Sequence, residues 1–274
     1  MTDRYAVIGN PVAHSKSPQL HAAFARATGQ DLCYEAILAP LDAFAATVRA
    51  FIASGGRGMN VTVPFKVEAC RLADTRSARA EAAGAVNTLV FSAAGIHGDN
   101  TDGVGLVADL RRNLGLDLRG KRVLLLGAGG AARGVLLPLL QERPAKLALA
   151  NRSADKARRL AAEFAARAPG WVADAGGFDE LAGRCFDLVV NATAASLEDA
   201  APPLPAGLFA PASCAYDMVY GKGVTPFLRA AGEQGASRLA DGLGMLVEQA
   251  AESFCLWRGM RPDTAPVLAG LRAA

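Results

Sequence analysis

Residues 122–133 read Arg-Val-Leu-Leu-Leu-Gly-Ala-Gly-Gly-Ala-Ala-Arg, the pattern of a strand, a glycine-rich turn and the start of a helix. A short apolar run leads into a glycine cluster, which opens a helix of small residues. In such a unit Gly127 permits the tight turn, Gly129 lets the backbone approach a pyrophosphate, and Ala132 lets the helix pack on the strand. The N–H groups and the dipole at the helix N-terminus attract the anion. We therefore predict a dinucleotide-binding turn, formed by Gly127, Ala128, Gly129, Gly130 and Ala131.

The residues after the next predicted strand indicate which dinucleotide binds. In NAD-binding units a carboxylate about 20 residues beyond the glycines accepts hydrogen bonds from the ribose 2′-OH. Here the predicted strand over 146–150 is followed by Asn151 and Arg152, with no carboxylate at its end. Arg152 offers a planar cation for a 2′-phosphate, and Lys156 adds a second charge one helical turn later. The pattern favours NADP over NAD, unless Arg152 is only a surface residue at a strand end.

The composition of the 274-residue chain is typical of a globular protein. Hydrophobic residues make up 51% of it, and its length allows two domains. The formal net charge is +3 and the basic residues are dispersed, which argues against a nucleic-acid partner. The long uncharged stretches at 82–98 and 200–216 are interrupted by polar residues or prolines, so no membrane span is expected.

The cysteines and the N-terminus indicate the compartment. The five cysteines are odd in number and form no Cys-x-x-Cys pair, which favours reduced thiols. The N-terminal residues lead directly into a strand and lack the features of a signal peptide. We expect a cytoplasmic protein. A chain of this size could be a monomer or a homodimer.

Strand-like and helix-like runs alternate along the chain, which predicts two α/β domains with mostly parallel sheets. The spans expected as strands are 5–8, 32–38, 58–61, 86–91, 122–126, 146–150, 187–191 and 214–218. The spans expected as helices are 18–28, 41–54, 103–114, 131–141, 153–167 and 241–257. The segment 198–212 contains four prolines and is expected to be an irregular surface loop. The predicted domains are 1–102 and 103–240, with 241–274 returning to the first and a cleft between the two.

Polar clusters follow two strands of the first predicted domain. Ser15 and Ser17 alternate after the first strand, so both hydroxyls could face one small ligand; alternatively, Ser17 only caps the helix that begins at Pro18. Asn60, Thr62 and Lys66 follow another strand, and strand carboxyl ends line the crevice where α/β proteins bind ligands. Taken singly, Lys66 has a plain alternative, because a surface lysine is usually only solvated.

Three further positions complete the candidate residues. Asn87 follows the segment Gly-Ala-Val, and Asp102 lies in Asn-Thr-Asp-Gly, where it could simply cap the next helix. Asn191 and Thr193 follow a strand of the second domain, where a nicotinamide ribose would lie. No cluster of histidine, cysteine or acidic residues has the spacing of metal ligands, so no metal is expected.

Nine motifs in a fixed order resemble those of the shikimate dehydrogenase family. The first four are Gly-x-Pro-x-x-His-Ser-x-Ser-Pro, Asn-Val-Thr-x-Pro-x-Lys, Gly-Ala-Val-Asn-Thr and Asn-Thr-Asp-Gly. Gly-Ala-Gly-Gly-Ala-Ala-Arg-Gly, Asn-Arg-Ser, Asn-Ala-Thr, Tyr-Asp-Met-x-Tyr and Asp-Gly-Leu-Gly-Met-Leu-Val-x-Gln-Ala follow. The resemblance extends from residue 5 to about residue 262. It implies a substrate-binding first domain and a Rossmann-type domain that binds NADP.

The resemblance also assigns roles by position. It makes Lys66 and Asp102 the catalytic pair, without deciding which of them carries the proton. The implied substrate contacts are Ser15, Ser17, Asn60, Thr62, Asn87, Tyr220 and Gln249. The implied cofactor contacts beyond the glycine turn are Asn151, Arg152, Lys156, Asn191, Thr193, Met218, Gly242 and Met245. Met245 and Gln249 are four residues apart and share one face of the predicted helix.

The implied reaction is the reversible NADPH-dependent reduction of 3-dehydroshikimate to shikimate, a step of chorismate and aromatic amino acid biosynthesis. The alternatives are a broader quinate/shikimate dehydrogenase and a non-catalytic module that senses a dinucleotide. One stretch departs from the family pattern Asn-Ala-Thr-Ser-x-Gly. This chain has Ala194 and Ser196 where that pattern has a serine and a glycine.

Overall fold

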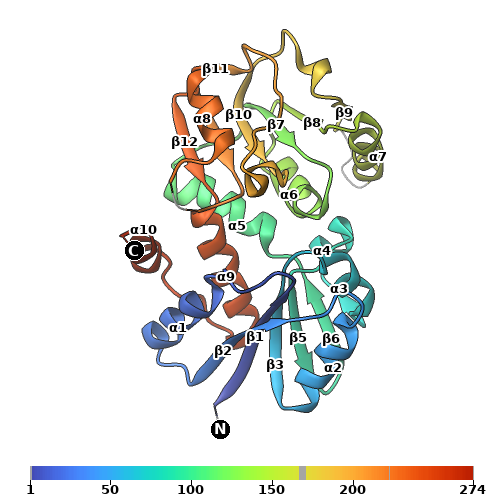
Figure 1. Ribbon diagram of the computed structural model, residues 1–274, viewed down its shortest axis with the longest axis vertical. Coiled ribbons are helices and arrows are strands. Elements are labelled where there is room, and N and C mark those ends of the chain that lie inside the picture. Colours follow the sequence, from blue (N-terminus) through green and yellow to red (C-terminus); the bar gives the residue numbers. More distant parts are fainter. Residues whose placement is uncertain (1, 167–170, 222, 274) are drawn as a thin grey trace. The chain divides into compact units, whose positions relative to one another are not determined.

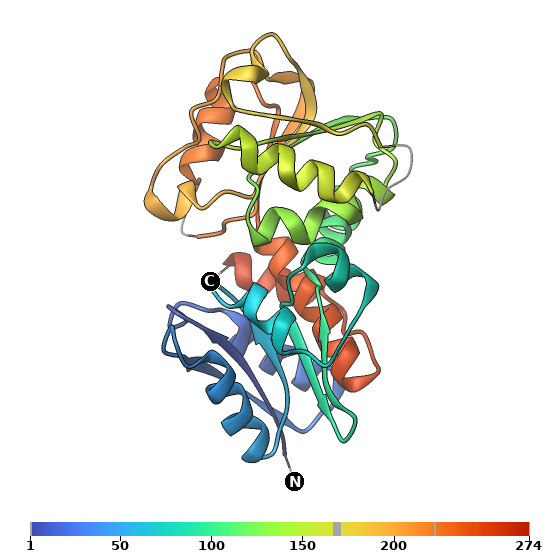
Figure 2. The ribbon, with the colours of Figure 1, turned by 90° about the vertical axis from the view of Figure 1, so that its right-hand side faces the viewer.

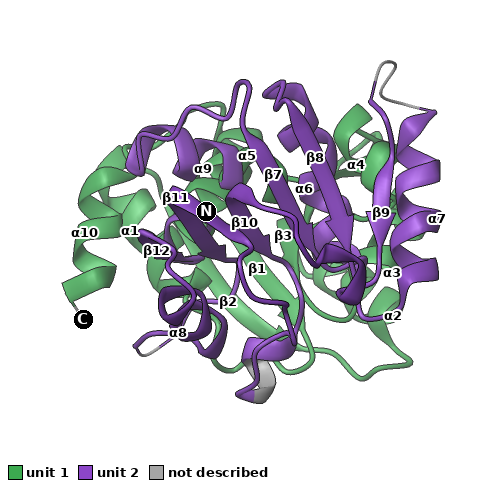
Figure 3. Cartoon of the chain, turned by 90° about the horizontal axis from the view of Figure 1, so that it is seen from above, with its two compact units in different colours: residues 1–105, 246–274 green, residues 106–245 purple. Residues whose placement is uncertain are grey.

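The computed structural model describes residues 2–166, 171–221 and 223–273 of the chain. Residues 1–105 and 246–274 form one compact unit, here called unit 1, and residues 106–245 form unit 2 (Figure 3). The chain passes between them within two helices, α5 (Asp102–Ala108) and α9 (Leu243–Arg258). Each unit has its own six-stranded sheet with helices packed on it (Figure 1). The expected class of two α/β units is therefore confirmed.

The sheet of unit 1 has the strand order β2-β1-β3-β5-β6-β4. β1 runs parallel to β2 and β3, whereas β5 is antiparallel to both β3 and β6. The strands are β1 (Asp3–Gly9), β2 (Leu32–Leu38), β3 (Gly56–Val61), β4 (Thr75–Arg76), β5 (Thr88–Ser92) and β6 (Gly95–Asp99). The helices that lie wholly in unit 1 are α1 (Ser17–Thr28), α2 (Phe44–Ala53), α3 (Lys66–Leu72), α4 (Ala78–Ala83) and α10 (Ala265–Ala273).

Helices cover both faces of this sheet, and α2 and α9 lie on opposite faces (Figure 2). On one face Phe44 and Val48 of α2 join Met59 of β3 in a buried apolar core. On the other face the ring of Phe254 from α9 lies 5.8 Å from the ring of Phe24 in α1. Trp257 stacks on Tyr5 of β1 at 4.7 Å between ring centroids. The C-terminal part of the chain thus completes the core of the N-terminal sheet.

The sheet of unit 2 has the order β12-β11-β10-β7-β8-β9, and all of its strands are parallel. The strands are β7 (Arg122–Leu126), β8 (Lys146–Ala150), β9 (Asp174–Gly176), β10 (Phe186–Asn191), β11 (Phe209–Asp217) and β12 (Arg238–Asp241). The helices are α6 (Gly130–Gln141), α7 (Ala154–Ala165) and α8 (Pro226–Glu233), with short helical turns at Asp109–Asn113, Asp179–Leu181 and Ala195–Glu198. β7 lies at the centre and reads as a continuous apolar run because helices cover both faces of a parallel sheet.

Both sheets contain a point at which the strand order changes direction, and ligands of open α/β sheets bind at the carboxyl ends of the strands there. In unit 1 this point lies between β1 and β3, because β2 lies on the other side of β1. The loops 10–16 and 62–65 follow these two strands. In unit 2 it lies between β7 and β10, which pair in register from Leu188 opposite Val123 to Asn191 opposite Leu126. The fold alone therefore directs attention to one edge of each sheet.

The structure corrects several sequence expectations. The strand expected over 86–91 is present as β5, but it begins at Thr88, turns back through a tight hairpin and pairs antiparallel with β6, so this part of the sheet is not parallel. The segment 198–212 is not irregular throughout, since β11 already begins at Phe209. Phe209 pairs with Phe186, the register then shifts, and Ala212 adopts a positive φ of 61° within the shift. A bulge of this kind accommodates Pro211 because the ladder of hydrogen bonds is interrupted there.

Helix boundaries also differ from expectation. The helix expected at 103–114 begins at Asp102 and changes after Ala108 into a π-helical turn over Asp109–Asn113. The last long helix begins at Leu243, because residues 238–241 pair with β11 as β12. The helix expected at 153–167 spans Ala154–Ala165, and residue 167 lies outside the described residues. Within the described ranges, we find no helix with both the length and the apolar character needed to cross a membrane.

Candidate active site

Lys66 and Asp102 form an ion pair at the carboxyl edge of the unit 1 sheet. Lys66 is the first residue of α3, Asp102 opens α5, and Lys66 Nζ lies 2.6 Å from Asp102 Oδ2. The Lys66 side chain is 20% exposed and that of Asp102 is 8% exposed. Two residues 36 positions apart are thus held as one largely buried pair.

Asn87 occupies the centre of this arrangement. Its Nδ2 donates to Asp102 Oδ1 at 2.8 Å, which leaves Oδ2 of that carboxylate to Lys66. The same Nδ2 lies 3.3 Å from Oε1 of Gln249, which comes from α9. The structure therefore brings four of the predicted residues together: Lys66, Asn87, Asp102 and Gln249.

A buried set of hydroxyls behind these residues was not singled out from the sequence. Ser253 Oγ lies 2.8 Å from Thr88 Oγ1 and 3.2 Å from Thr101 Oγ1, and all three residues are fully buried. Thr101 N–H and Thr88 Oγ1 both donate to Asn87 Oδ1, at 2.8 and 2.9 Å. These contacts orient the Asn87 amide so that its Nδ2 faces Asp102. The only sequence signal is that Ser253 lies one helical turn beyond Gln249.

Asn60 connects this hydroxyl set to Tyr34. Asn60 Nδ2 donates to Ser253 Oγ at 3.0 Å and to Thr88 Oγ1 at 3.1 Å. The Tyr34 hydroxyl donates to Asn60 Oδ1 at 2.7 Å. Burial raises the pKa of Tyr34 well above its usual value, so the hydroxyl keeps its proton and remains a donor. Both polar atoms of the Asn60 side chain thus already have protein partners.

Ser15, Ser17 and Thr62 lie on the two loops that leave β1 and β3. Ser17 is the first residue of α1 and its side chain does not cap that helix; instead, its N–H donates to Ser15 Oγ at 3.2 Å. The alternative that Ser17 is only a helix cap is therefore wrong. Thr62 N–H bonds to the carbonyl oxygen of Ile8 at 2.9 Å, which ties the second loop to the end of β1. Ser17 is buried, whereas Ser15 and Thr62 are half-buried.

The glycine turn of unit 2 has the geometry that a pyrophosphate site requires. Gly127 follows β7 with a φ of +113°, a conformation that side chains disfavour. A Cβ at this position would lie 3.0 Å from the carbonyl oxygen of Ala192, so the neighbouring loop also requires glycine there. α6 begins at Gly130, and a Cβ added at Gly129 or at Gly130 would meet no other atom within 4 Å. The helix N-terminus is therefore open, and these residues fit a dinucleotide phosphate.

The residues expected to read the ribose follow β8, the neighbour of β7. Leu126 pairs with Ala150, so the two strands end side by side. Asn151 Nδ2 donates to the carbonyl oxygen of Ser153 at 3.1 Å and shapes the turn into α7. Arg152 and Lys156 are both exposed. Two accessible cations thus lie after the strand adjacent to the glycine turn, which fits a 2′-phosphate.

The remaining residues predicted to contact the cofactor lie at or after the ends of β10, β11 and β12. Asn191 Oδ1 accepts hydrogen bonds from Thr193 N–H at 3.1 Å and Thr193 Oγ1 at 2.7 Å. Met218 N–H bonds to the carbonyl oxygen of Asn191 at 2.9 Å, and Gly242 N–H bonds to that of Val219 at 3.2 Å. Gly242 and Met245 are buried, whereas Met218 and Tyr220 are half-buried. The contacts of these loops centre on Asp217, which lies in the Tyr-Asp-Met-x-Tyr motif but was assigned no role from the sequence.

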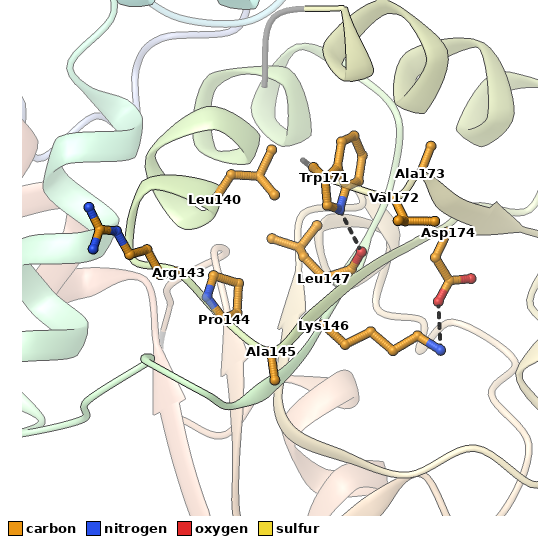
Figure 4. Close-up of a pocket in the computed structure, with 10 residues that line it drawn as sticks. All are labelled: Leu140, Arg143, Pro144, Ala145, Lys146, Leu147, Trp171, Val172, Ala173 and Asp174. Atoms are coloured by element: carbon orange, nitrogen blue, oxygen red, sulfur yellow. Dashed lines mark hydrogen bonds and ion pairs between the residues drawn. The ribbon is translucent and has the colours of Figure 1, made fainter. Parts of the chain in front are cut away.

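A hollow of unit 2 lies elsewhere. It has a volume of about 730 Å³ and is lined by residues 140, 143–147 and 171–174 (Figure 4). Lys146, which is ion-paired to Asp174 at 3.1 Å, is the first residue of β8. The hollow is therefore at the amino end of the sheet, opposite the edge that carries the glycine turn. Its size does not make it the candidate site.

These features together define a protein of two α/β units, one with a Rossmann-type dinucleotide fold and one with a lysine–aspartate pair among amide side chains. Residues 7–89 match the family model described as the shikimate dehydrogenase substrate binding domain. Residues 109–198 match that of shikimate / quinate 5-dehydrogenase, and residues 242–272 match the shikimate 5′-dehydrogenase C-terminal domain. The chain belongs to the shikimate dehydrogenase family.

Individual relatives agree with this assignment. A shikimate dehydrogenase (NADP(+)) of Aromatoleum aromaticum is 66% identical, over 98% of this chain and 97% of that protein. The crystal structure of an Ael1 enzyme from Pseudomonas putida is 52% identical, covers 98% of each chain and has a TM-score of 0.90. A shikimate 5-dehydrogenase from Thermus thermophilus, solved in complex with NADP(H) and shikimate, is 36% identical over 99% of each chain, with a TM-score of 0.88.

Proposed function

We propose that the protein catalyses the reversible NADPH-dependent reduction of 3-dehydroshikimate to shikimate, a step of chorismate and aromatic amino acid biosynthesis. The observation that carries the proposal is the 2.6 Å pair of Lys66 and Asp102, with Asn87 and Gln249 beside it. A cation, an anion and two amides in one place suit a ring that presents several hydroxyls and one carbonyl. Unit 1 would then bind the substrate, and unit 2 the cofactor.

NADPH supplies the hydride when it is bound. The task of the protein at the substrate is to stabilise the carbonyl oxygen as it becomes an alkoxide and to give it a proton. We propose that Lys66 lies at this oxygen, because its ammonium group both stabilises negative charge and can donate. In the reverse direction the neutral amine of Lys66 takes the proton back. Asp102 holds this group in place and can relay its proton, so we assign the proton step to the pair.

The other predicted residues orient the ring. We propose that Asn87 and Gln249 bind ring hydroxyls with Asp102, and that Ser15, Ser17 and Thr62 bind the substrate carboxylate together with Tyr220. Asn60 has a different role in this proposal. Because both of its polar atoms already bond to Tyr34, Thr88 and Ser253, it positions Asn87 and its neighbours rather than contacting the substrate.

On the cofactor side, Gly127, Ala128, Gly129, Gly130 and Ala131 would hold the pyrophosphate, and Asn151, Arg152 and Lys156 the phosphorylated ribose. Asn191, Thr193, Met218, Gly242 and Met245 would surround the nicotinamide end. We also place the enzyme in the cytoplasm, the reducing compartment in which its five thiols remain free.

Activity on quinate is a second candidate, because the family model matched by residues 109–198 is described as shikimate / quinate 5-dehydrogenase. The test is a steady-state assay that follows the absorbance of the reduced cofactor, with shikimate or quinate as substrate and NADP or NAD as cofactor. We expect shikimate with NADP to give the highest kcat/KM. No NADP reduction in the presence of shikimate would refute the proposed function.

The role of the ion pair is tested with Lys66→Ala. We expect kcat to fall by about 10²–10⁴-fold, because the proton donor and the charge on the alkoxide are both lost. The affinity for NADPH, measured by its fluorescence, should remain that of the wild type. Lys121→Ala removes an exposed lysine of unit 2 and serves as the control. Near-normal turnover of Lys66→Ala would remove this residue from the mechanism.

A further inference from the structure

A single buried carboxylate organises the loops at the carboxyl edge of the unit 2 sheet. Asp217 ends β11 and has no solvent exposure. Its Oδ1 accepts hydrogen bonds from Asn191 Nδ2 and Val219 N–H, both at 3.1 Å. Its Oδ2 accepts from Ser196 Oγ at 2.7 Å and from Thr225 Oγ1 at 2.6 Å. All four donors are neutral groups, so the charge of Asp217 is stabilised by hydrogen bonds rather than by a counterion.

These donors come from the end of β10 and from the segments that follow β10 and β11. Asn191 is the last residue of β10, and Ser196 lies in the short helical turn after it. Val219 lies in the loop after β11, and Thr225 is the N-cap of α8, where its Oγ1 also accepts the N–H of Leu228. Hydrogen bonds to a charged acceptor are stronger than those between neutral groups, and each lost donor leaves part of a buried charge unsatisfied. Asp217 therefore fixes the mutual positions of two loops, the one after β10 and the one between β11 and α8.

The same contacts reach the predicted cofactor residues. Asn191, which donates to Asp217, also accepts hydrogen bonds from Thr193 through its Oδ1 and so holds Thr193 in place. The backbone of Ala192 and Thr193 lies against Gly127, at 3.0 Å and 3.3 Å from the position of a Cβ there. Val219, whose N–H is held by Asp217, accepts the N–H of Gly242 through its carbonyl oxygen. A shift at Asp217 would thus move both the loop beside the glycine turn and the segment that carries Gly242.

We propose that Asp217 is a positioning residue for the nicotinamide end of the cofactor, and that the Ser196 hydroxyl is the donor that fixes the 192–196 loop. This inference rests on the proposed function, because it deepens the account of the same cofactor site. It concerns the stretch in which this chain departs from the family pattern. The hydroxyl missing at Ala194 is present two residues later, at the position from which it reaches Oδ2 of Asp217.

Ser196 is the best position at which to test this role. It is half-buried and lies at the surface end of the network, so its replacement leaves the β-sheet and the core of unit 2 unchanged. In Ser196→Ala we expect the KM and the dissociation constant for NADPH to rise roughly 3- to 10-fold, the effect of one net hydrogen bond. The KM for shikimate should stay at its wild-type value, and the melting temperature of the free enzyme should fall by no more than a few degrees, because Asp217 keeps its three other donors.

Two further variants make the result specific. Ser196→Thr keeps the hydroxyl and should retain wild-type affinity for NADPH. Ser237→Ala removes an exposed serine of the same unit and should change nothing. An unchanged NADPH affinity in Ser196→Ala would overturn the inference, and so would equal losses for both substrates or a loss in Ser196→Thr. The wild-type assay with shikimate and NADP keeps these outcomes separate from a failure of the proposed function itself.

Discussion

Arg152 shows how much a single exposed side chain can decide. Nothing in the fold of unit 2 requires arginine at this position, because the residue follows β8 and faces solvent. Its value lies in charge and shape, since a guanidinium group binds phosphate oxygens through two parallel hydrogen bonds. We therefore expect this residue to distinguish NADP from NAD without contributing to the core.

We expect Arg152→Asp to weaken NADPH binding at least tenfold and to bring the NADPH and NADH preferences closer together. A carboxylate repels the 2′-phosphate and offers an acceptor to the ribose 2′-OH of NADH. The measurement is kcat/KM for both cofactors in parallel. Arg159→Asp makes the same charge change at an exposed position within α7 and should leave the ratio unchanged. An unaltered ratio in Arg152→Asp would mean that other residues read the 2′-phosphate.

Among individual residues, the sequence predicts which ones carry chemistry better than it predicts which ones hold them. Lys66, Asn87 and Asp102 could be singled out because they are polar and follow strands or open helices. Thr88, Thr101 and Ser253 could not, because small hydroxyl residues are common everywhere in a chain. Their importance depends on tertiary contacts that bring residues more than 150 positions apart within 3.2 Å. Asp217 is an intermediate case. A charged residue at the end of an apolar strand stands out in the sequence, but the sequence does not show which residues bond to it.

The close approach of helices α5 and α9 in unit 1 depends on one missing side chain. A Cβ at Gly105 would lie 2.6 Å from Gln249 Cβ and 2.7 Å from its backbone nitrogen. The backbone of α9 cannot move away without taking Gln249 with it. Gly105 thus permits the helix contact that places Gln249 beside Asn87.

We expect Gly105→Ala to destabilise unit 1 and to raise the KM for shikimate, although alanine is favoured over glycine within helices by about 1 kcal/mol. The steric overlap with backbone outweighs that gain. Gly270→Ala is the matched control, because Gly270 lies in α10 with nothing within 4 Å of an added Cβ. Thermal unfolding and shikimate kinetics of both variants are the measurements. A more stable Gly105→Ala enzyme with normal kinetics would contradict the role of this contact.

The elements that the sequence predicted correctly are those with strong local patterns. β7, α6 and β8 have buried runs or helical periodicity, and their boundaries agree within one residue. The β5–β6 hairpin and β12 were missed because their strands are short and their pairing partners lie outside the segment itself. β11 was recognised only in its second half, since prolines before it mark a loop and the bulge that tolerates Pro211 is a tertiary feature.

In the molecule as a whole, each unit carries one of the two tryptophans, which allows the stability of each to be followed separately. Trp257 belongs to unit 1 and Trp171 to unit 2. Trp257 lies in an aromatic cluster with His21, whose ring stacks on Tyr34 at 4.2 Å between centroids. Burial lowers the pKa of His21 to about 3, so the folded protein keeps this imidazole neutral. The unfolded chain protonates it near pH 6.5.

This difference makes the stability of unit 1 depend on pH in a defined direction. Between pH 6.5 and about 3 the unfolded state binds one more proton than the folded state, so the contribution is full above pH 6.5 and falls as the pH decreases. The expected slope is about 1.4 kcal/mol per pH unit. Protonation of Asp99 further reduces the stability of unit 1, but only at lower pH. Burial would raise the pKa of its carboxyl, but hydrogen bonds from Arg79 and Ser77 outweigh this and hold the pKa below its usual value.

The test is denaturant unfolding of a Trp171→Phe variant at several pH values from about 7 to about 4.5, with Trp257 fluorescence as the reporter of unit 1. His21→Phe in the same background keeps an aromatic ring in the cluster and removes the titrating group. Its absolute stability can change through packing, whereas its slope against pH should become smaller by about 1.4 kcal/mol per pH unit. His14→Phe replaces an exposed histidine and should retain the original slope. Parallel curves for His21→Phe and its parent would show that another group governs the acid sensitivity of this unit.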